Sequence, residues 1–155
     1  MAGVIADDEA IGWVGQVGAS ARWVTSVCTG SLILGGAGLL RGYKATTHWG
    51  WRETLSLFGA EAVAARTVVD RNRVTGGGVT AGIDFALTLM AEIRGEAHAR
   101  MVQLSLEYDP QPPFDAGSPE RAGPEMVEGY MRRADKLAPG RVEELRAAAA
   151  KRGFS

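Results

Sequence analysis

The 155-residue chain, 46% hydrophobic and 23% charged, is long enough to form one domain with a buried core. Its formal net charge of −1 gives no reason to expect a nucleic-acid or membrane-surface partner. The chain has a single cysteine and no apolar run long enough to cross a bilayer. Its first residues include acids where a signal peptide would carry lysine or arginine. These features predict a cytoplasmic protein.

The first half of the chain alternates helical and strand patterns. Helices are indicated by apolar residues at helical spacing and by acids at their starts, and strands by short β-branched runs. The expected elements are a helix at 7–18, a strand at 22–27 (RWVTSV), a helix at 29–40, a strand at 44–47 (KATT) and a helix at 49–57.

The second half begins with a predicted hairpin and continues with helices. The expected elements are strands at 66–69 and 73–75, helices at 80–93 and 96–108, a proline-rich loop at 109–119, and two helices separated at 139–140. Alternating strands and helices predict an α/β fold, a mostly parallel sheet with helices on both faces. We expect residues 1–119 to form the α/β domain and residues 120–155 a C-terminal helical tail packed on the same domain.

Cys28 lies where a predicted strand gives way to a predicted helix. Small residues, Ser26 and Gly30, stand two positions to either side, as in a nucleophile elbow, where a sharp turn exposes the reactive side chain. The positive end of the helix dipole favours a thiolate, and the first free amides, near Thr29 and Gly30, are placed to stabilise a developing anion. The pattern alone leaves open a second interpretation, a small buried hydrophobe, which is what most unpaired cysteines are.

Three segments in the same order resemble the ThiJ/PfpI superfamily, relatives of the class I glutamine amidotransferases. The cysteine segment of that superfamily is very similar to WVTSVCTGSLILGGAGLLRGYKATTHW. Its isocyanide hydratases resemble this chain in two later segments, VTGGGVTAGIDFAL and LEYDPQPPFDAGSPE. The resemblance implies a flavodoxin-like, class I glutamine amidotransferase-like fold and the addition of water to an isocyanide, giving an N-substituted formamide. It also implies that Cys28 is the nucleophile and that Thr29 hydrogen-bonds the thiolate or the intermediate. Peptidase-like members carry histidine directly after the cysteine, so Thr29 in that position disfavours peptidase activity.

His48 follows the second predicted strand, whose carboxyl end borders the same crevice as Cys28 in a doubly wound sheet. It is either a base or orienting group, or a hydrogen-bonded structural histidine beside an aromatic residue, and we favour the structural interpretation. Three glycines at 76–78 match neither a Walker loop nor a dinucleotide fingerprint, and favour close backbone approach near the crevice. Two scattered histidines and one cysteine offer no metal-ligand spacing, so we expect no metal and no cofactor.

Full-length members of the superfamily begin with a strand, a loop whose acidic residue faces the cysteine, and a Gly-Gly loop, none of which has a counterpart here. We therefore expect an N-terminally incomplete fold, exposed apolar surface that favours a homodimer, and no complete active site from the 155 residues alone. The leading prediction is a hydratase-like cysteine enzyme acting on a small molecule. The alternative is a non-catalytic or thiol-sensing module, either a truncated paralogue or a ligand-sensing domain like those of AraC-type regulators.

Overall fold

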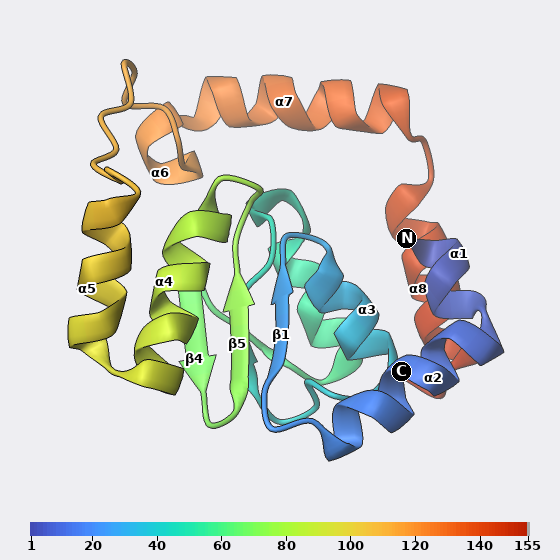
Figure 1. The fold of residues 1–155 in the computed structure, drawn as a ribbon. Helices are drawn as coiled ribbons and strands as arrows, with labels where there is room; N and C mark the ends of the chain where they lie inside the picture. Colours follow the sequence, from blue (N-terminus) through green and yellow to red (C-terminus); the bar gives the residue numbers. More distant parts are fainter. Residues whose placement is uncertain (155) are drawn as a thin grey trace. The chain divides into compact units, whose positions relative to one another are not determined.

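A computed structural model describes residues 1–154 of the chain (Figure 1). The chain forms two compact units: residues 1–86 with the C-terminal residues from Val142 onward, and residues 87–141. The elements are α1 (Ala2–Ala6), α2 (Asp8–Ser20), β1 (Val24–Val27), α3 (Gly30–Gly36), β2 (Lys44–Ala45), the 3₁₀ helix η1 (Trp49–Phe58), β3 (Glu61–Ala62), β4 (Thr67–Asp70), β5 (Arg73–Gly76), α4 (Ala81–Arg94), α5 (Glu96–Ser105), α6 (Pro119–Ala122), α7 (Pro124–Leu137) and α8 (Arg141–Lys151).

The main sheet of the first unit has the strand order β1–β5–β4 (Figure 1). β1 and β5 run parallel, which places Val24 opposite Arg73 and Val27 opposite Gly76. β4 and β5 run antiparallel around a two-residue turn, and β2 and β3 form a separate parallel pair. The predicted α/β class with a parallel-containing sheet and the predicted hairpin are therefore confirmed, and the hairpin supplies the antiparallel strand.

α2 begins where the sequence predicts. The Asp7 side chain accepts hydrogen bonds from the amides of Glu9 and Ala10, both at 3.0 Å, and thus satisfies two of the free donors at the helix start. The helix passes Gly18 and ends at Ser20. Gly18 allows α2 to pack closely against Leu39, whose side chain would have to shift if a Cβ were present there.

Other predicted elements differ in length or type. α3 ends at Gly36 rather than at residue 40. The strand predicted at 44–47 contains only two residues, because the Thr46 amide donates to the Thr75 hydroxyl and not to a carbonyl of a neighbouring strand. The helix predicted at 49–57 is a 3₁₀ helix that ends before the left-handed Gly59 (φ 71°). α1 was not predicted, and its fully buried Ile5 anchors it to the core.

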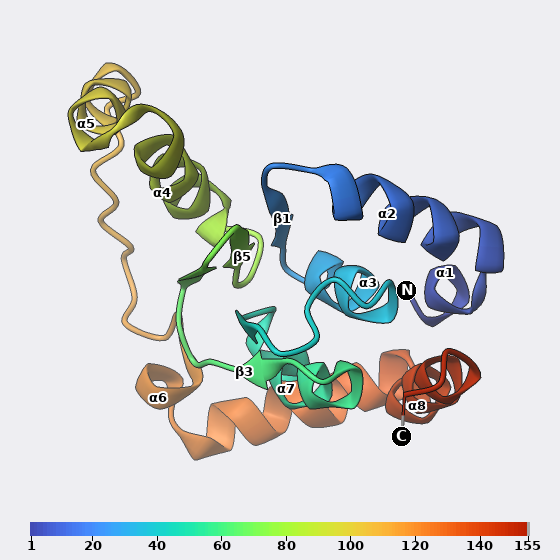
Figure 2. The ribbon, with the colours of Figure 1, turned by 90° about the horizontal axis from the view of Figure 1, so that it is seen from below.

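The hydrophobic core of the first unit lies among α1, α2, α3, η1 and α8. Its buried side chains are those of Ile5, Ile11, Leu32, Leu40, Ala45, Leu55, Phe58, Ala60, Leu145, Ala148 and Ala149. Lys151 and Arg152 at the end of α8 donate to carbonyls of α1, at 2.6 and 2.9 Å, so these two helices lie side by side (Figure 2). The last helix thus contributes to the core, while the domain boundary at residue 119 stays a prediction.

The second unit contains the end of α4 and the helices α5, α6 and α7. Pro119 and Pro124 occupy first positions of α6 and α7, where a missing amide hydrogen costs no helical hydrogen bond. α7 ends at Leu137 and α8 begins at Arg141, which confirms the predicted break at 139–140. Throughout residues 1–154, no helix combines the length and apolar character needed to cross a membrane.

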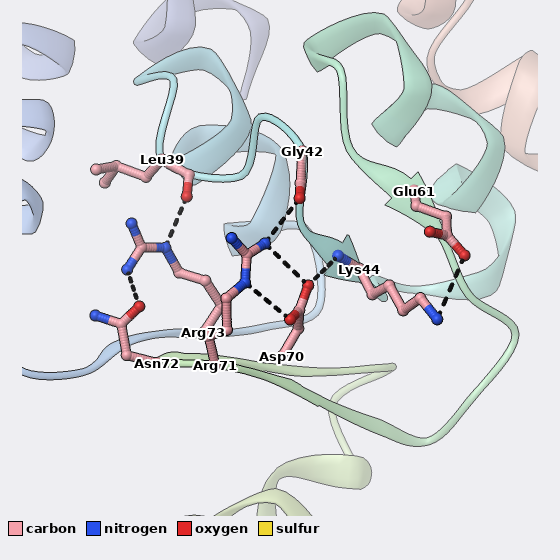
Figure 3. A network of polar contacts seen from close by, with 8 residues as sticks. All are labelled: Leu39, Gly42, Lys44, Glu61, Asp70, Arg71, Asn72 and Arg73. Atoms are coloured by element: carbon pink, nitrogen blue, oxygen red, sulfur yellow. Dashed lines mark hydrogen bonds and ion pairs between the residues drawn. The ribbon is translucent and has the colours of Figure 1, made fainter.

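A charged network ties the β4–β5 turn to the segment between α3 and β2 (Figure 3). Its members are Leu39, Gly42, Tyr43, Lys44, Glu61, Asp70, Arg71, Asn72 and Arg73. The Arg73 side chain extends from β5 toward Leu39, where its Nε donates to the Leu39 carbonyl at 2.7 Å and its Nη1 to Asn72 Oδ1 at 2.7 Å. Arg73 is only 9% exposed, so these bonds satisfy a charge that is largely removed from water.

Arg71 forms the outer part of the charged network. It has a left-handed backbone (φ 55°), and its Nη2 donates to the Gly42 carbonyl at 2.7 Å while its Nε contacts Asp70 Oδ1 at 3.0 Å. The second oxygen of Asp70 accepts the Lys44 amide at 2.8 Å. The guanidinium of Arg71 also stacks on Tyr43, with 3.5 Å from its central carbon to the ring centroid. Hydrogen bonding from Arg71, and then from the Lys44 amide, lowers the pKa of Asp70.

Candidate active site

Cys28 lies in the turn between β1 and α3, and its backbone is left-handed (φ 57°). This conformation is uncommon for residues with a Cβ and is found where surrounding structure enforces it. It lets the chain leave the strand and enter the helix within two residues, as in a nucleophile elbow. The predicted strand-to-helix turn is thus confirmed, and Cys28 is partly exposed.

Hydrogen bonds fix the backbone of Cys28 on both sides. Its amide donates to the carbonyls of Gly76 and Gly77, at 3.0 and 2.7 Å. Its carbonyl accepts from the Thr47 hydroxyl at 2.7 Å and from the Ser31 amide at 3.3 Å. The glycine loop therefore approaches the cysteine itself, which is the close backbone approach that the sequence favoured.

Behind the elbow lies a group of hydroxyl side chains, which we call the hydroxyl layer: Ser26, Ser31, Thr46, Thr47 and Thr75. The Ser31 hydroxyl donates to the Thr46 carbonyl at 2.7 Å and lies 2.8 Å from the Ser26 oxygen. Because a serine has one hydroxyl proton, Ser26 is the donor of the second bond. The Thr46 amide donates to the Thr75 hydroxyl at 2.9 Å. The layer thus fastens the segment after β2 to β1, α3 and β5.

Thr29 and Gly30 occupy the first positions of the helix that follows the elbow. The first backbone bonds there are donated by Ser31 to Cys28 and by Leu32 to Thr29, at 3.3 and 3.1 Å. The amides of Thr29 and Gly30 precede these bonds, as a role in anion stabilisation requires. The Thr29 hydroxyl makes no capping bond to the helix.

His48 lies beside the glycine loop that contacts Cys28. Its Cδ2 is 3.4 Å from the position that a Cβ on Gly78 would occupy. Its Nδ1 accepts from the Gly50 amide at 3.2 Å, so the neutral ring carries its proton on Nε2. The ring stacks on Trp49 with centroids 5.6 Å apart. The structure therefore gives His48 a capping role at the start of η1 and places it near the elbow, while its role in chemistry stays a prediction.

The sequence interpretation missed Thr47 and the rest of the hydroxyl layer. The KATT segment was predicted to be a strand, which would have alternated its side chains between two faces. A weak signal was available in the two consecutive threonines before His48, since hydroxyl residues at the end of a strand often bond to backbone. Among residues 1–154, the structure contains no group of three or more histidine, cysteine or carboxylate side chains suited to a metal ion.

Comparisons with known proteins agree with this geometry. An isonitrile hydratase of Pseudomonas putida is 51% identical over 145 residues, which cover 94% of this chain and 64% of the hydratase. The crystal structure of a ThiJ/PfpI family protein from Pseudomonas syringae superposes with a TM-score of 0.83 and 48% identity, covering 99% of this chain and 60% of that one. The chain therefore spans less than two thirds of the length of either protein.

A transcriptional regulator also shares part of the sequence. The HTH-type transcriptional regulator GbdR of Pseudomonas aeruginosa is 37% identical over 87 residues, or 55% of this chain and 23% of the regulator. The family model described as DJ-1/PfpI matches residues 3–92, which is more than half of the chain and includes the whole cysteine elbow. The chain belongs to the DJ-1/PfpI family.

Proposed function

We propose that the chain carries the cysteine site of an isocyanide hydratase-like enzyme, which adds water to an isocyanide and gives an N-substituted formamide. The observation that carries this proposal is the left-handed Cys28 in a strand-to-helix elbow. The 51% identity to an isonitrile hydratase supports the substrate class, because isonitrile and isocyanide name the same group.

In the proposed reaction, the Cys28 thiolate attacks the terminal carbon of R–N≡C. A carbon–sulfur bond forms and the carbon takes up a proton from solvent, which gives the thioimidate Cys–S–CH=N–R. Water then adds to the same carbon, the carbon–sulfur bond breaks, and R–NH–CHO leaves while the thiolate is restored and one proton returns to solvent. One water is consumed for each formamide, and no electrons are gained or lost.

Three neighbours are assigned supporting roles in this proposal. The Thr29 hydroxyl, which does not cap the helix, hydrogen-bonds the thiolate or the thioimidate. The amides of Thr29 and Gly30 stabilise negative charge that develops during attack. His48, which lies beside the glycine loop, belongs to the substrate neighbourhood of the cysteine.

We also propose that the protein acts in the cytoplasm as a homodimer. Association is supported by exposed apolar side chains of the first unit, including Trp13 at 64% exposed and Val79 at 80% exposed. Sedimentation velocity at several protein concentrations tests the dimer, and a species that stays monomeric throughout contradicts it.

The alternative function is a thiol-sensing or ligand-sensing module without turnover. The 37% identity to a transcriptional regulator favours this alternative over other non-enzymatic roles. It differs from the hydratase in one respect that is easily measured: it requires no covalent bond between Cys28 and an isocyanide.

The test combines product analysis with intact-protein mass spectrometry. The purified protein is incubated with an alkyl or aryl isocyanide, and Cys28→Ala, checked for folding by circular dichroism, is the matched control. We expect a thioimidate adduct on the natural chain and none on Cys28→Ala. Formamide release would show in addition that the 155 residues complete the reaction. If the natural chain gives no formamide and no adduct although iodoacetamide alkylates Cys28, the hydratase proposal is wrong and the sensing module is favoured.

A further inference from the structure

We infer that Thr47 is a positioning residue for Cys28, because its hydroxyl keeps the cysteine in the left-handed conformation that presents the thiol. The inference deepens the proposed function, since it rests on Cys28 acting as a nucleophile. Its main readout is the reactivity of the thiol, which needs no isocyanide.

The geometry at Cys28 shows why one hydroxyl matters. The amide side of the residue is fixed by two glycine carbonyls, so its φ angle is restrained by the loop after β5. The carbonyl side has two donors, and the Thr47 hydroxyl at 2.7 Å is much closer than the Ser31 amide at 3.3 Å. The orientation of this carbonyl defines ψ of Cys28, so Thr47 is the principal restraint on the second dihedral angle of the elbow.

Thr47 is buried, so a water molecule does not readily replace its hydroxyl as a donor to the Cys28 carbonyl. Thr47 is 2% exposed and Cys28 only partly exposed, so loss of the hydroxyl leaves the Cys28 carbonyl with the longer bond from the Ser31 amide alone. A residue with a Cβ that loses such a restraint relaxes toward right-handed or extended conformations. Relaxation turns the Cys28 side chain away from its exposed position at the elbow.

Thr47 can act as a restraint because the residue before it is itself held in place. The Thr46 amide donates to Thr75, and its carbonyl accepts from Ser31, at 2.9 and 2.7 Å. A β-branched side chain at position 47 also has few rotamers, so the hydroxyl starts from a fixed frame and points in a fixed direction.

Thr46 provides a matched control for a merely structural role. Both threonines are almost fully buried, at 1% and 2% exposed, and each hydroxyl donates to a main-chain carbonyl. Thr46→Val removes one such bond but leaves the two backbone bonds of that residue intact. Thr47→Val removes the bond to the cysteine. The two variants thus each remove one hydrogen bond from a threonine hydroxyl to a main-chain carbonyl. Only the bond lost in Thr47→Val is to Cys28.

The experiment measures the second-order rate of Cys28 alkylation by iodoacetamide, which reports one site because the chain has one cysteine. We expect Thr47→Val to slow alkylation by at least about fivefold, since reactivity depends steeply on placement. Thr47→Ser should restore the rate, and Thr46→Val should leave it within about twofold of the natural chain. Equal effects of the two valine variants, or no effect of Thr47→Val, would overturn the inference.

A second measurement covers the case in which Thr47→Val does not fold. Glycine adopts the left-handed conformation without a restraint, so the Cys28→Gly background removes the strain that Thr47 is proposed to oppose. In that background we expect folded Thr47→Val, with a urea midpoint close to that of Thr46→Val. A Thr47→Val chain that is unfolded there as well contradicts the inference. The two proposals can fail separately. If the natural chain gives neither formamide nor adduct but its alkylation depends on Thr47, the hydratase proposal is wrong and the positioning role of Thr47 is supported.

Discussion

The two ends of the β1–β5–β4 sheet each hold a non-glycine residue in the left-handed conformation, and they do so by different means. At the carboxyl end of β1, Cys28 (φ 57°) is held by main-chain groups and a buried neutral hydroxyl. At the β4–β5 turn, Arg71 (φ 55°) is held by its contacts with the Asp70 carboxylate and the Gly42 carbonyl. The hydroxyl layer thus holds the proposed nucleophile without adding a charge beside it, whereas the charged network ties a turn to the segment between α3 and β2.

Solvent exposure explains why neutral hydroxyls occur at one end of the sheet and charged side chains at the other. The side chains of Asp70 and Arg71 are 22% and 57% exposed, so both ions keep part of their hydration. Ser31 and Thr75 are 0% exposed, and a charge in their position would lose its water and require a partner. We therefore expect the hydroxyl layer to resist changes of salt and pH and the outer part of the charged network to respond to them.

Arg73 should give the largest effect on stability, because it is the buried member of the charged network. Arg73→Met removes the donors of the Leu39 carbonyl and the Asn72 side chain, and we expect a loss of about 2–3 kcal/mol in the free energy of unfolding. Urea unfolding followed by circular dichroism measures it. Arg71→Met is the exposed control, and a larger loss for that variant would mean that burial does not control the energetics of this network.

Ser31→Ala tests the hydroxyl layer. The substitution removes the donor of the Thr46 carbonyl and the acceptor of Ser26, and we expect a loss of about 1–2 kcal/mol. The loss should be the same in dilute buffer and in about 0.5 M NaCl, since salt screens neutral hydrogen bonds very little. A loss that shrinks in high salt would show that charge contributes to this end of the sheet.

Asp70→Asn tests the response of the charged network to pH. The pKa of Asp70 is lowered by hydrogen bonds from Arg71 and from the Lys44 amide. A carboxylate with a lowered pKa stabilises the fold above its unfolded value of about 4 and loses that effect as the pH falls through the folded value. The natural chain should therefore be more stable than Asp70→Asn at neutral pH, and the difference should shrink below about pH 4. Urea midpoints measured across this range check it, and a constant difference contradicts it.

Glu61→Gln should have the smallest effect. The Lys44–Glu61 pair is 3.9 Å long, and its side chains are 60% and 66% exposed, so solvent screens the attraction. We expect a change below about 0.5 kcal/mol, detectable only as a slight shift of the urea midpoint. A change as large as that of Ser31→Ala would contradict the distinction between buried and exposed polar contacts.

Local patterns predicted the elements that have local causes. The acids at the start of α2, the polar residues of the hairpin turn and the small residues around Cys28 each specify backbone conformation within a few positions, and the structure has the helix start, the hairpin and the elbow. The apolar run after Cys28 predicted too long a helix, because its glycines allow turns that hydrophobicity alone does not reveal. The exposed Trp13 likewise cannot be recognised from a helical pattern that also contains the buried Ile11.

The sequence by itself determined that a cysteine stands at a strand-to-helix turn, because small neighbours and a change of periodicity are visible along the chain. Only the tertiary structure decided what holds that turn. Thr47 is 19 residues from Cys28, and the two glycine carbonyls reach the cysteine because β1 pairs in parallel with β5. Such contacts depend on strand register and on the path of the chain between strands, which are set by packing across the whole unit. The elbow is therefore a local feature of the sequence, and its restraint is a property of the fold.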